Sequence, residues 1–317
     1  MPSVETTGGP VDVDELGLTL IHEHFRTTDE AGRFQFPHLY DEQAEWDAAI
    51  ADANAVKGHG VRTVVEPGAM FLTRDAAFSK RVADESGLNV VLATGIYTYD
   101  HLPQFLANRD EDGIAAIFAY ELEHGIQGTG IKAAFVKCAA DAQGVTPNVE
   151  KVHRAAARAA KQSGKPIMAH SHPSSGTGLE QMRIFGEEGV DATTVHIAHT
   201  GDTDDLDYIE RLLETGCWIG MDRYGLDLFL ATEPRNKTVL ALLERGYADR
   251  MFLSQDYCSS IDWFPAEVQE YLKANEVPKW SMTFLFEEVI PELKERGMTD
   301  EQLTTMLEEN PKRWLGA

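Results

Sequence analysis

Side chains that can take part in a metal site stand at the ends of several short apolar segments of this chain. They are His22 and His24 after the first segment, Lys137 after the fourth, His170 after the fifth, His199 after the sixth and Asp256 after the eighth. Neutral imidazole and carboxylate groups together suit Zn²⁺, and they also bind iron, cobalt and manganese. The residue types therefore predict a divalent metal site, provided that the fold brings these segment ends together.

His22 and His24 are separated by a single residue, Glu23. Residues i and i+2 of a strand point to the same side. The two imidazoles can therefore hold one cation, and we expect Glu23 to point elsewhere. A His-x-His pair alone is a weak signal of a metal site. The stronger signal is its position at a segment end, because further candidate ligands stand at equivalent ends.

Each candidate also has a structural interpretation. His170 and His199 could be ordinary core or loop histidines, and Asp256 could cap the turn that follows it. For His172 and His196 the structural interpretation is the stronger one. His196 precedes His199 by three residues, an odd number, so we expect it to point away from His199. Four other histidines are expected in solvated helices or loops, namely His59, His101, His124 and His153.

Lys137 is the unusual member of the set, because burial of a lysine is costly and its ammonium group repels cations. One interpretation is a lysine whose head group reaches an acidic partner or solvent. The other is reaction of its amine with carbon dioxide, which gives a carbamate with two oxygens and one negative charge. Such a group could bridge two metals as a carboxylate does.

Two alternating patterns predict the elements that position these residues. Short apolar segments, typical of strands buried on both faces of a parallel sheet, are 18–21, 61–65, 90–94, 133–136, 166–169, 194–198, 218–221 and 251–254. Amphipathic stretches, most of them followed by a glycine and therefore typical of helices, are 42–57, 75–86, 112–124, 149–163, 179–188, 204–215 and 237–245. Strand and helix in alternation predict one (β/α)8 TIM barrel domain over residues 1–317.

The active sites of such barrels lie at the C-terminal ends of the strands. The candidate ligands stand at five of these ends, so a barrel would bring them together at one mouth. The long segment 257–280 follows the eighth strand, and we expect it to form either a working loop or packing helices.

Composition and charge narrow the classes of partner. The 317 residues include 52 acidic and 28 basic side chains, and the formal net charge of −24 disfavours binding to nucleic acid or to anionic membranes. No secretory signal or membrane span is evident. The three cysteines are far apart and form no zinc or disulfide motif. We therefore expect a cytoplasmic protein that acts on a neutral small molecule.

The candidate residues resemble the phosphotriesterase family of the amidohydrolase superfamily, and within it most of all the phosphotriesterase-like lactonases. The resemblance rests on His22-x-His24, Lys137, His170, His199 in His-Thr-Gly-Asp-Thr-Asp-Asp and Asp256 in Ser-Gln-Asp-Tyr. It covers nearly the whole chain and extends to the segments 95–99 and 220–227. Lactonases of this kind typically hydrolyse N-acyl-homoserine lactones and other lactones, with weak activity on organophosphate triesters.

The resemblance implies a binuclear metal site and a homodimer. It implies that His22, His24 and Asp256 hold the more buried ion, that His170 and His199 hold the more exposed one, and that a carbamylated Lys137 and a hydroxide bridge them. Zinc is the default metal, with iron, cobalt and manganese as alternatives. Asp256 would also transfer a proton, Tyr97 would lie near the hydroxide, and Arg223 would shape the loop after the seventh strand.

The resemblance also implies an apolar substrate pocket, with ordinary packing as the alternative for each apolar residue. Its candidate residues are Leu72, Tyr97, Arg223, Leu226, Phe229, Cys258 and Trp263. Burial of an acyl tail there would contribute about 0.8 kcal/mol per methylene. The alternative functions are a phosphotriesterase or other carboxylesterase, a cyclic amidase, and a scaffold barrel that binds metals without catalysis.

Overall fold

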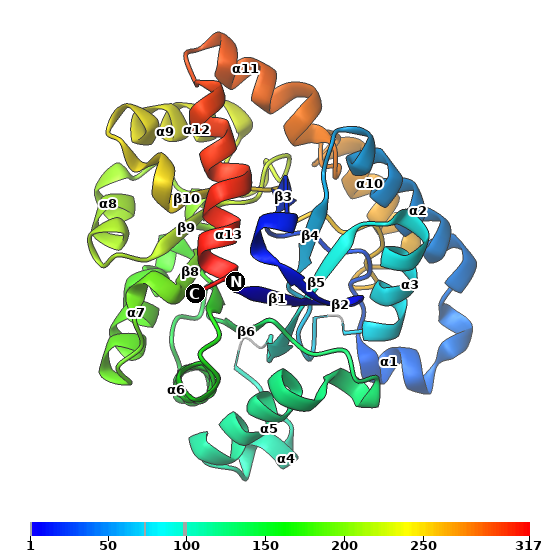
Figure 1. The fold of residues 1–317 in the computed structure, drawn as a ribbon. Helices are drawn as coiled ribbons and strands as arrows, with labels where there is room; N and C mark the ends of the chain where they lie inside the picture. The colour runs from blue at the N-terminus through cyan, green and yellow to red at the C-terminus, as the bar shows by residue number, and fades with distance from the viewer. Residues whose placement is uncertain (1, 73, 98–99) are drawn as a thin grey trace.

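The computed structural model describes residues 2–72, 74–97 and 100–317, and a sheet of eight parallel strands forms its centre (Figure 1). The strands are β3 (Thr19–Leu20), β4 (Thr63–Glu66), β5 (Asn89–Gly95), β6 (Phe135–Ala139), β7 (Ile167–His170), β8 (Val195–Ala198), β9 (Trp218–Met221) and β10 (Met251–Leu253). Each strand pairs with its neighbours in chain order. Two parallel bridges, His24 with Cys258 and Thr27 with Ile261, join the segments beyond β3 and β10. The predicted TIM barrel is confirmed.

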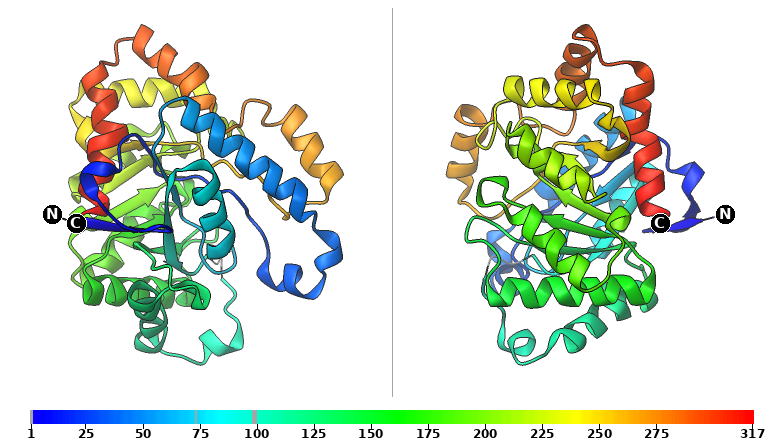
Figure 2. Two further views of the ribbon diagram at one scale, coloured as in Figure 1. Left: turned by 45° about the vertical axis from the view of Figure 1, so that its right-hand side comes forward. Right: turned by 90° about the vertical axis from the view of Figure 1, so that its left-hand side faces the viewer.

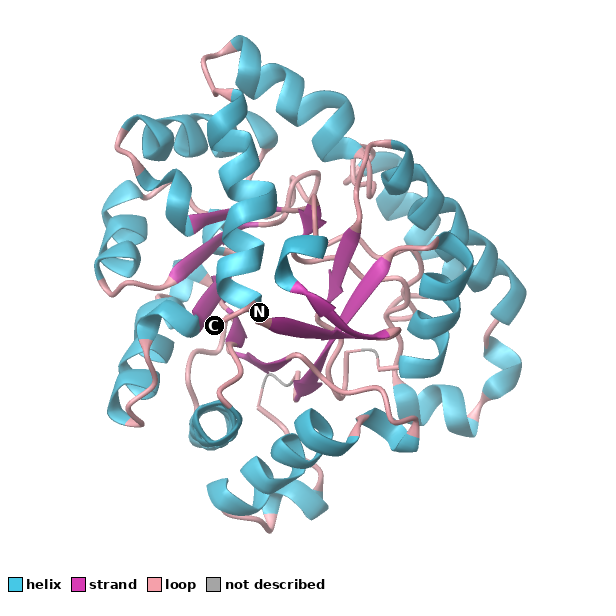
Figure 3. Ribbon diagram, viewed as in Figure 1, coloured by secondary structure: helices cyan, strands magenta, loops and turns pink. Residues whose placement is uncertain are grey.

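Helices surround the strands on the outside of the barrel (Figure 3). The seven predicted helices are present as α2 (Glu42–Gly58), α3 (Ala76–Ser86), α5 (Glu111–His124), α6 (Pro147–Ser163), α7 (Thr177–Glu187), α8 (Leu206–Glu214) and α9 (Thr232–Glu244). Gly87 and Gly164 end α3 and α6 in the left-handed conformation, with φ of 73° and 68°. Glycine adopts this conformation without a steric penalty, which is why it marks helix ends in the sequence.

The two ends of the chain close the N-terminal end of the barrel. β1 (Ser3–Thr6) and β2 (Gly9–Asp12) form an antiparallel hairpin, and α13 (Asn310–Leu315) lies beside it (Figure 1). From α13 the fully buried Trp314 packs into the barrel, with its ring 5.3 Å from Phe135 and 6.1 Å from Phe252. This end is a packed core, so the opposite end is left for a site.

Shorter helices surround that opposite end. They are α1 (Glu30–Gln35), α4 (Gln104–Ala107) and α10 (Ala266–Asn275), and the chain continues through α11 (Ile290–Glu295) and α12 (Asp300–Thr304) to α13. Figure 2 shows α1 and α10 on the side away from both termini. The segment 257–280 thus combines loop and helix. Among the described residues, no helix is both long enough and apolar enough to cross a membrane.

Two expectations about histidines are wrong. The expectation that His153 is solvated fails, because the ring is fully buried on the inner face of α6 and hydrogen-bonds to the backbone oxygen of Val149 at 2.7 Å. The expectation that His196 points away from His199 fails, because both rings approach Asp222. His199 lies beyond β8 with a φ of 65°, and this left-handed backbone interrupts the strand alternation. The expected exposure holds for His59, His101 and His124.

Candidate metal centre and active site

His22 and His24 follow β3 at the mouth of the barrel and converge on one carboxylate. The Nε2 atoms of both rings lie 3.3 Å from Oδ1 of Asp256. Glu23 points elsewhere, as its position between them predicts, and its buried carboxylate accepts a hydrogen bond from the backbone N–H of Gln255 at 2.8 Å. The segment after β10 is therefore held against β3, which fixes Asp256 opposite the two histidines.

His199 and His170 complete a group of four histidines around this point. The ring centroids of His22 and His199 are 4.8 Å apart, and those of His170 and His199 are 4.5 Å apart. Donor atoms of His22, His199 and Asp256 lie within 4.8 Å of one another, so they could hold a metal ion. His199 and Asp256 both have positive φ, 65° and 51°. Such strain costs about 1–3 kcal/mol per residue and clusters at functional sites.

Lys137 reaches the same group from within β6, which continues to Ala139 instead of ending before the lysine. Its Nζ atom lies 3.4 Å from Nε2 of His22 and 3.3 Å from Sδ of Met168, and the side chain is fully buried. Burial lowers the pKa of Lys137 to about 8, although the charge of Asp256 opposes this. Gly95 on β5 permits the close approach of the two strands, because a Cβ atom there would overlap the carbonyl oxygen of Lys137.

A carboxylate holds one ring nitrogen of each of the four histidines. The pairs are His22 Nδ1 with Asp222 at 3.1 Å, His199 Nδ1 with Asp222 at 3.1 Å, His24 Nδ1 with Glu66 at 2.6 Å and His170 Nε2 with Asp141 at 2.9 Å. Such partners fix the orientation and tautomer of a metal-binding imidazole. The chemistry of this donor set fits divalent ions, because the second nitrogen of each ring can offer its lone pair.

These three carboxylates were not predicted from the sequence. A signal was nevertheless present, since Glu66 directly follows the second apolar segment and Asp222 directly follows the seventh. Functional residues at the C-terminal ends of barrel strands include acidic residues as well as histidines. Asp141 lies two residues beyond the end of β6, where no pattern distinguishes it from an ordinary loop aspartate.

Burial sets the protonation of most of these rings. It lowers the pKa of His22 to about 4 and lowers the pKa of His170 and of His199 as well. These three imidazoles are therefore neutral at neutral pH, which is the form that binds a metal ion. Burial also acts to lower the pKa of His24, but the adjacent Glu66 and Asp256 raise it to about 9. A cation at this position would have to displace a proton.

Arg223 holds Asp256 from the loop that follows β9. Its Nε atom lies 2.8 Å from Oδ2 of Asp256, and its Nη1 atom lies 2.8 Å from Oδ2 of Asp202. The guanidinium group also stacks on the ring of Phe229, 4.4 Å from the centroid. Arg223 therefore connects a carboxylate of the cluster to the wall of the neighbouring cavity.

A cavity of about 460 Å³ opens from the cluster, and every predicted pocket residue lines it. They are Leu72, Tyr97, Arg223, Leu226, Phe229, Cys258 and Trp263. The Tyr97 ring lies edge-on to His170 at 5.1 Å and 6.2 Å from the Trp263 ring. Val268 and Leu272 of α10 also line the cavity, and the sequence did not predict them. Thr98 and Tyr99 of the 95–99 segment lie outside the described residues.

Known proteins resemble this chain along its whole length. The sequence model of the phosphotriesterase family matches residues 2–315. The chain is 47% identical over 304 residues to an aryldialkylphosphatase of Saccharolobus solfataricus, with 96% of each chain covered. It is 42% identical over 322 residues to a phosphotriesterase homology protein of Mycobacterium tuberculosis, with 99% of this chain and 97% of that one covered.

The fold agrees with the sequence matches. The solved structure of the phosphotriesterase from Mycobacterium tuberculosis superimposes with a TM-score of 0.94 at 41% identity, and the match covers 99% of this chain and 98% of the other. A metal-dependent hydrolase built on this barrel needs metal-binding side chains at the mouth, and here histidines and an aspartate gather there. The chain belongs to the phosphotriesterase family and is a hydrolase that acts on ester bonds.

Proposed function

We propose that this hydrolase opens lactone rings, with N-acyl-homoserine lactones as its main substrates and organophosphate triesters as weak ones. The observation that carries the proposal is the 460 Å³ cavity, whose walls next to the cluster are largely aliphatic and aromatic side chains. An acyl tail fits such a cavity, because each buried methylene contributes about 0.8 kcal/mol. The formal charge of −24 also favours a neutral substrate over an anionic one.

The proposal includes a pair of divalent ions, with zinc as the default. His22, His24 and Asp256 would hold one ion, His170 and His199 the other, and a carbamylated Lys137 would bridge them. When bound, such ions generate a hydroxide nucleophile near neutral pH and polarise the carbonyl group. A lowered pKa supports the modification of Lys137, because only the neutral amine attacks carbon dioxide, forming an N–C bond and releasing one proton.

Side chains of the protein would carry out the proton transfer and hold the substrate. Asp256 would accept the proton of the attacking hydroxide and return it to the alkoxide that leaves, which stays tethered when a ring opens. Positioned proton transfer of this kind is worth roughly 10²–10⁴-fold. Arg223 donates hydrogen bonds to Asp256 and Asp202, which would keep the carboxylate of Asp256 in place. Tyr97 would donate a hydrogen bond to an oxygen of the substrate.

A second candidate is hydrolysis of phosphotriesters as the main activity, because the similar protein of Saccharolobus solfataricus is an aryldialkylphosphatase. The test compares kcat/KM of the purified protein for homoserine lactones of several acyl lengths and for a neutral organophosphate triester. We expect the lactones to be preferred and the preference to grow with tail length. A higher kcat/KM for the triester would refute the lactonase proposal. Asp256→Asn serves as the control, because it should abolish both activities.

We also propose that the protein forms a homodimer in the cytoplasm. The exposed apolar side chains Phe34, Phe36 and Leu39, which are 81%, 54% and 70% exposed, support a self-association surface at α1 and the residues after it. The three cysteines are free thiols, which suits a reducing compartment. Light scattering after gel filtration tests the dimer, and Phe34→Ser with Leu39→Ser should shift it toward the monomer.

A further inference from the structure

Glu66 uses both carboxylate oxygens on two consecutive residues of the segment after β3. Oε1 lies 2.6 Å from Nδ1 of His24, and Oε2 accepts the backbone N–H of Phe25 at 2.6 Å. Glu66 is only 4% exposed, so water does not readily replace either hydrogen bond, and the loss of one is unfavourable. The N–H of Phe25 can only donate, so one of the two oxygens is always committed to it.

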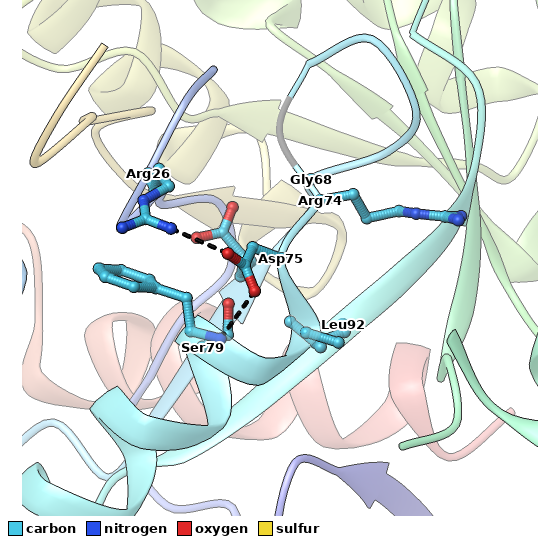
Figure 4. A pocket seen from close by; sticks show the side chains of 9 residues that line it. Arg26, Gly68, Arg74, Asp75, Ser79 and Leu92 are labelled. Atoms are coloured by element: carbon cyan, nitrogen blue, oxygen red, sulfur yellow. Dashed lines mark hydrogen bonds and ion pairs between the residues drawn. The ribbon is translucent and has the colours of Figure 1, made fainter. Parts of the chain in front are cut away.

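An ion-pair cluster behind Glu66 keeps this segment in place. Arg26 is 3% exposed and pairs with Asp75 at 2.8 Å and with Glu42 at 2.7 Å, and its guanidinium group lies 3.6 Å from the centroid of the Phe78 ring. Figure 4 shows the contact of Arg26 with Asp75, and both residues, together with Glu66, line a small cavity. The cavity of about 10 Å³ holds no more than about one water molecule, so Glu66 has little room to move.

We propose that Glu66 is a positioning residue that keeps the proton of His24 on Nδ1 and thereby reserves Nε2, the nitrogen that faces Asp256, for a divalent cation. The inference rests on the metal centre of the proposed function. It assigns to Glu66 the control of the His24 tautomer, which the metal ligands themselves do not provide. A metal-binding imidazole must be neutral with its lone pair directed at the ion, and a carboxylate on the other nitrogen selects that form.

Glu66→Gln tests the proposal because it keeps size and shape but offers one acceptor in place of two. If the amide oxygen accepts the Phe25 N–H, the amide N–H₂ faces Nδ1 of His24, which must then accept a hydrogen bond. The imidazole proton moves to Nε2, where it blocks the cation. If the amide turns over, the Phe25 N–H is left buried and unpaired, which is also unfavourable.

Two further variants separate tautomer control from general loss of stability. Glu66→Asp keeps two acceptor oxygens and should recover part of the lost affinity. Asp75→Asn weakens the contact to Arg26 in the wall of the same cavity without changing the acceptors of the His24 and Phe25 hydrogen bonds. It should lower the thermal stability and leave metal affinity close to that of the wild type.

The measurement is titration of the metal-free full-length chain with Zn²⁺ against a competing chelator, with Tm recorded for each variant. We expect Glu66→Gln to weaken binding of one ion by roughly 10–100-fold. Wild-type affinity in Glu66→Gln, or an equal loss in Asp75→Asn, would overturn the proposal. A wild-type chain that binds no Zn²⁺ would overturn the metal centre as well. A chain that binds Zn²⁺ but hydrolyses no lactone would refute only the lactonase function.

Discussion

His153 should make the protein sensitive to mild acid, and a substitution can isolate this effect. The buried ring donates from Nδ1 to the backbone oxygen of Val149, and its Nε2 atom lies 3.0 Å from Nε2 of Gln181. The same amide nitrogen of Gln181 donates to the backbone oxygen of His170 at 2.8 Å. The His153 ring must accept from Gln181, so protonation would set two donors against each other behind the metal centre.

The size of the effect follows from the pKa. Burial lowers the pKa of His153 to about 4 from an ordinary value of 6.5. Between these two values the unfolded chain binds a proton that the folded chain does not, so the free energy of unfolding decreases as the pH falls through this window. The full penalty is about 3 kcal/mol, and about 1 kcal/mol of it is already present at pH 5.5.

The assay compares Tm of the wild type and His153→Gln at pH 7.5 and pH 5.5. At pH 7.5 we expect the variant to be the less stable protein, because it loses packing of a buried ring. At pH 5.5 the difference should shrink by roughly 2 °C, because only the wild type pays the protonation cost. His124→Gln is the matched control, since His124 is exposed on α5. A Tm difference between wild type and His153→Gln that does not change with pH would show that protonation of His153 does not destabilise the fold.

Three further substitutions test the barrel core, the pocket and the chemistry. Trp314→Ala should destabilise the fold by about 3–5 kcal/mol, measured by denaturant unfolding, because it empties the packed end of the barrel; stability close to the wild type would contradict the role of α13. Asp262 accepts hydrogen bonds from Thr28 at 2.5 Å and from the Asp29 backbone at 2.9 Å. Asp262→Ala should therefore loosen the loop that carries Trp263 and raise KM for long-chain lactones about fivefold, equivalent to about 1 kcal/mol. An equal rise in KM for short-chain lactones would contradict this. Tyr97→Phe should lower kcat for lactones by about tenfold if its hydroxyl donates to the substrate, and an unchanged kcat would exclude that contact.

The strands of the barrel were predictable because they are buried on both faces. Continuous apolar segments such as 61–65 and 251–254 are short, and the segments between them have helical periodicity, so the order of elements determines the fold class. The N-terminal hairpin and α1 were not predictable in this way. Their residues are partly exposed and carry no periodic pattern, and their conformation depends on contacts with distant parts of the chain, such as the bond from Thr7 to Val90.

Parts of the site were predictable from position alone, and others required the fold. His22, His24 and Asp256 follow apolar segments, and the structure brings them together at one mouth. The burial of His153 had a signal, since it shares a helical face with the buried Val149 and Ala156 at spacings of four and three. The orientation of His199 had none, because it depends on a left-handed backbone after β8 and on the hydrogen bond from its own N–H to Asp222.

The proposed function depends on a pair of metal ions at the mouth of the barrel, bridged by a carbamylated Lys137. The most direct test is a crystal structure of the active protein with anomalous scattering recorded at the metal edges. We expect two peaks among His22, His24, His170, His199 and Asp256, with continuous density from Lys137 Nζ to a carbamate between them. A bare lysine and no anomalous peaks, in protein that hydrolyses lactones at full rate, would contradict the proposed metal centre.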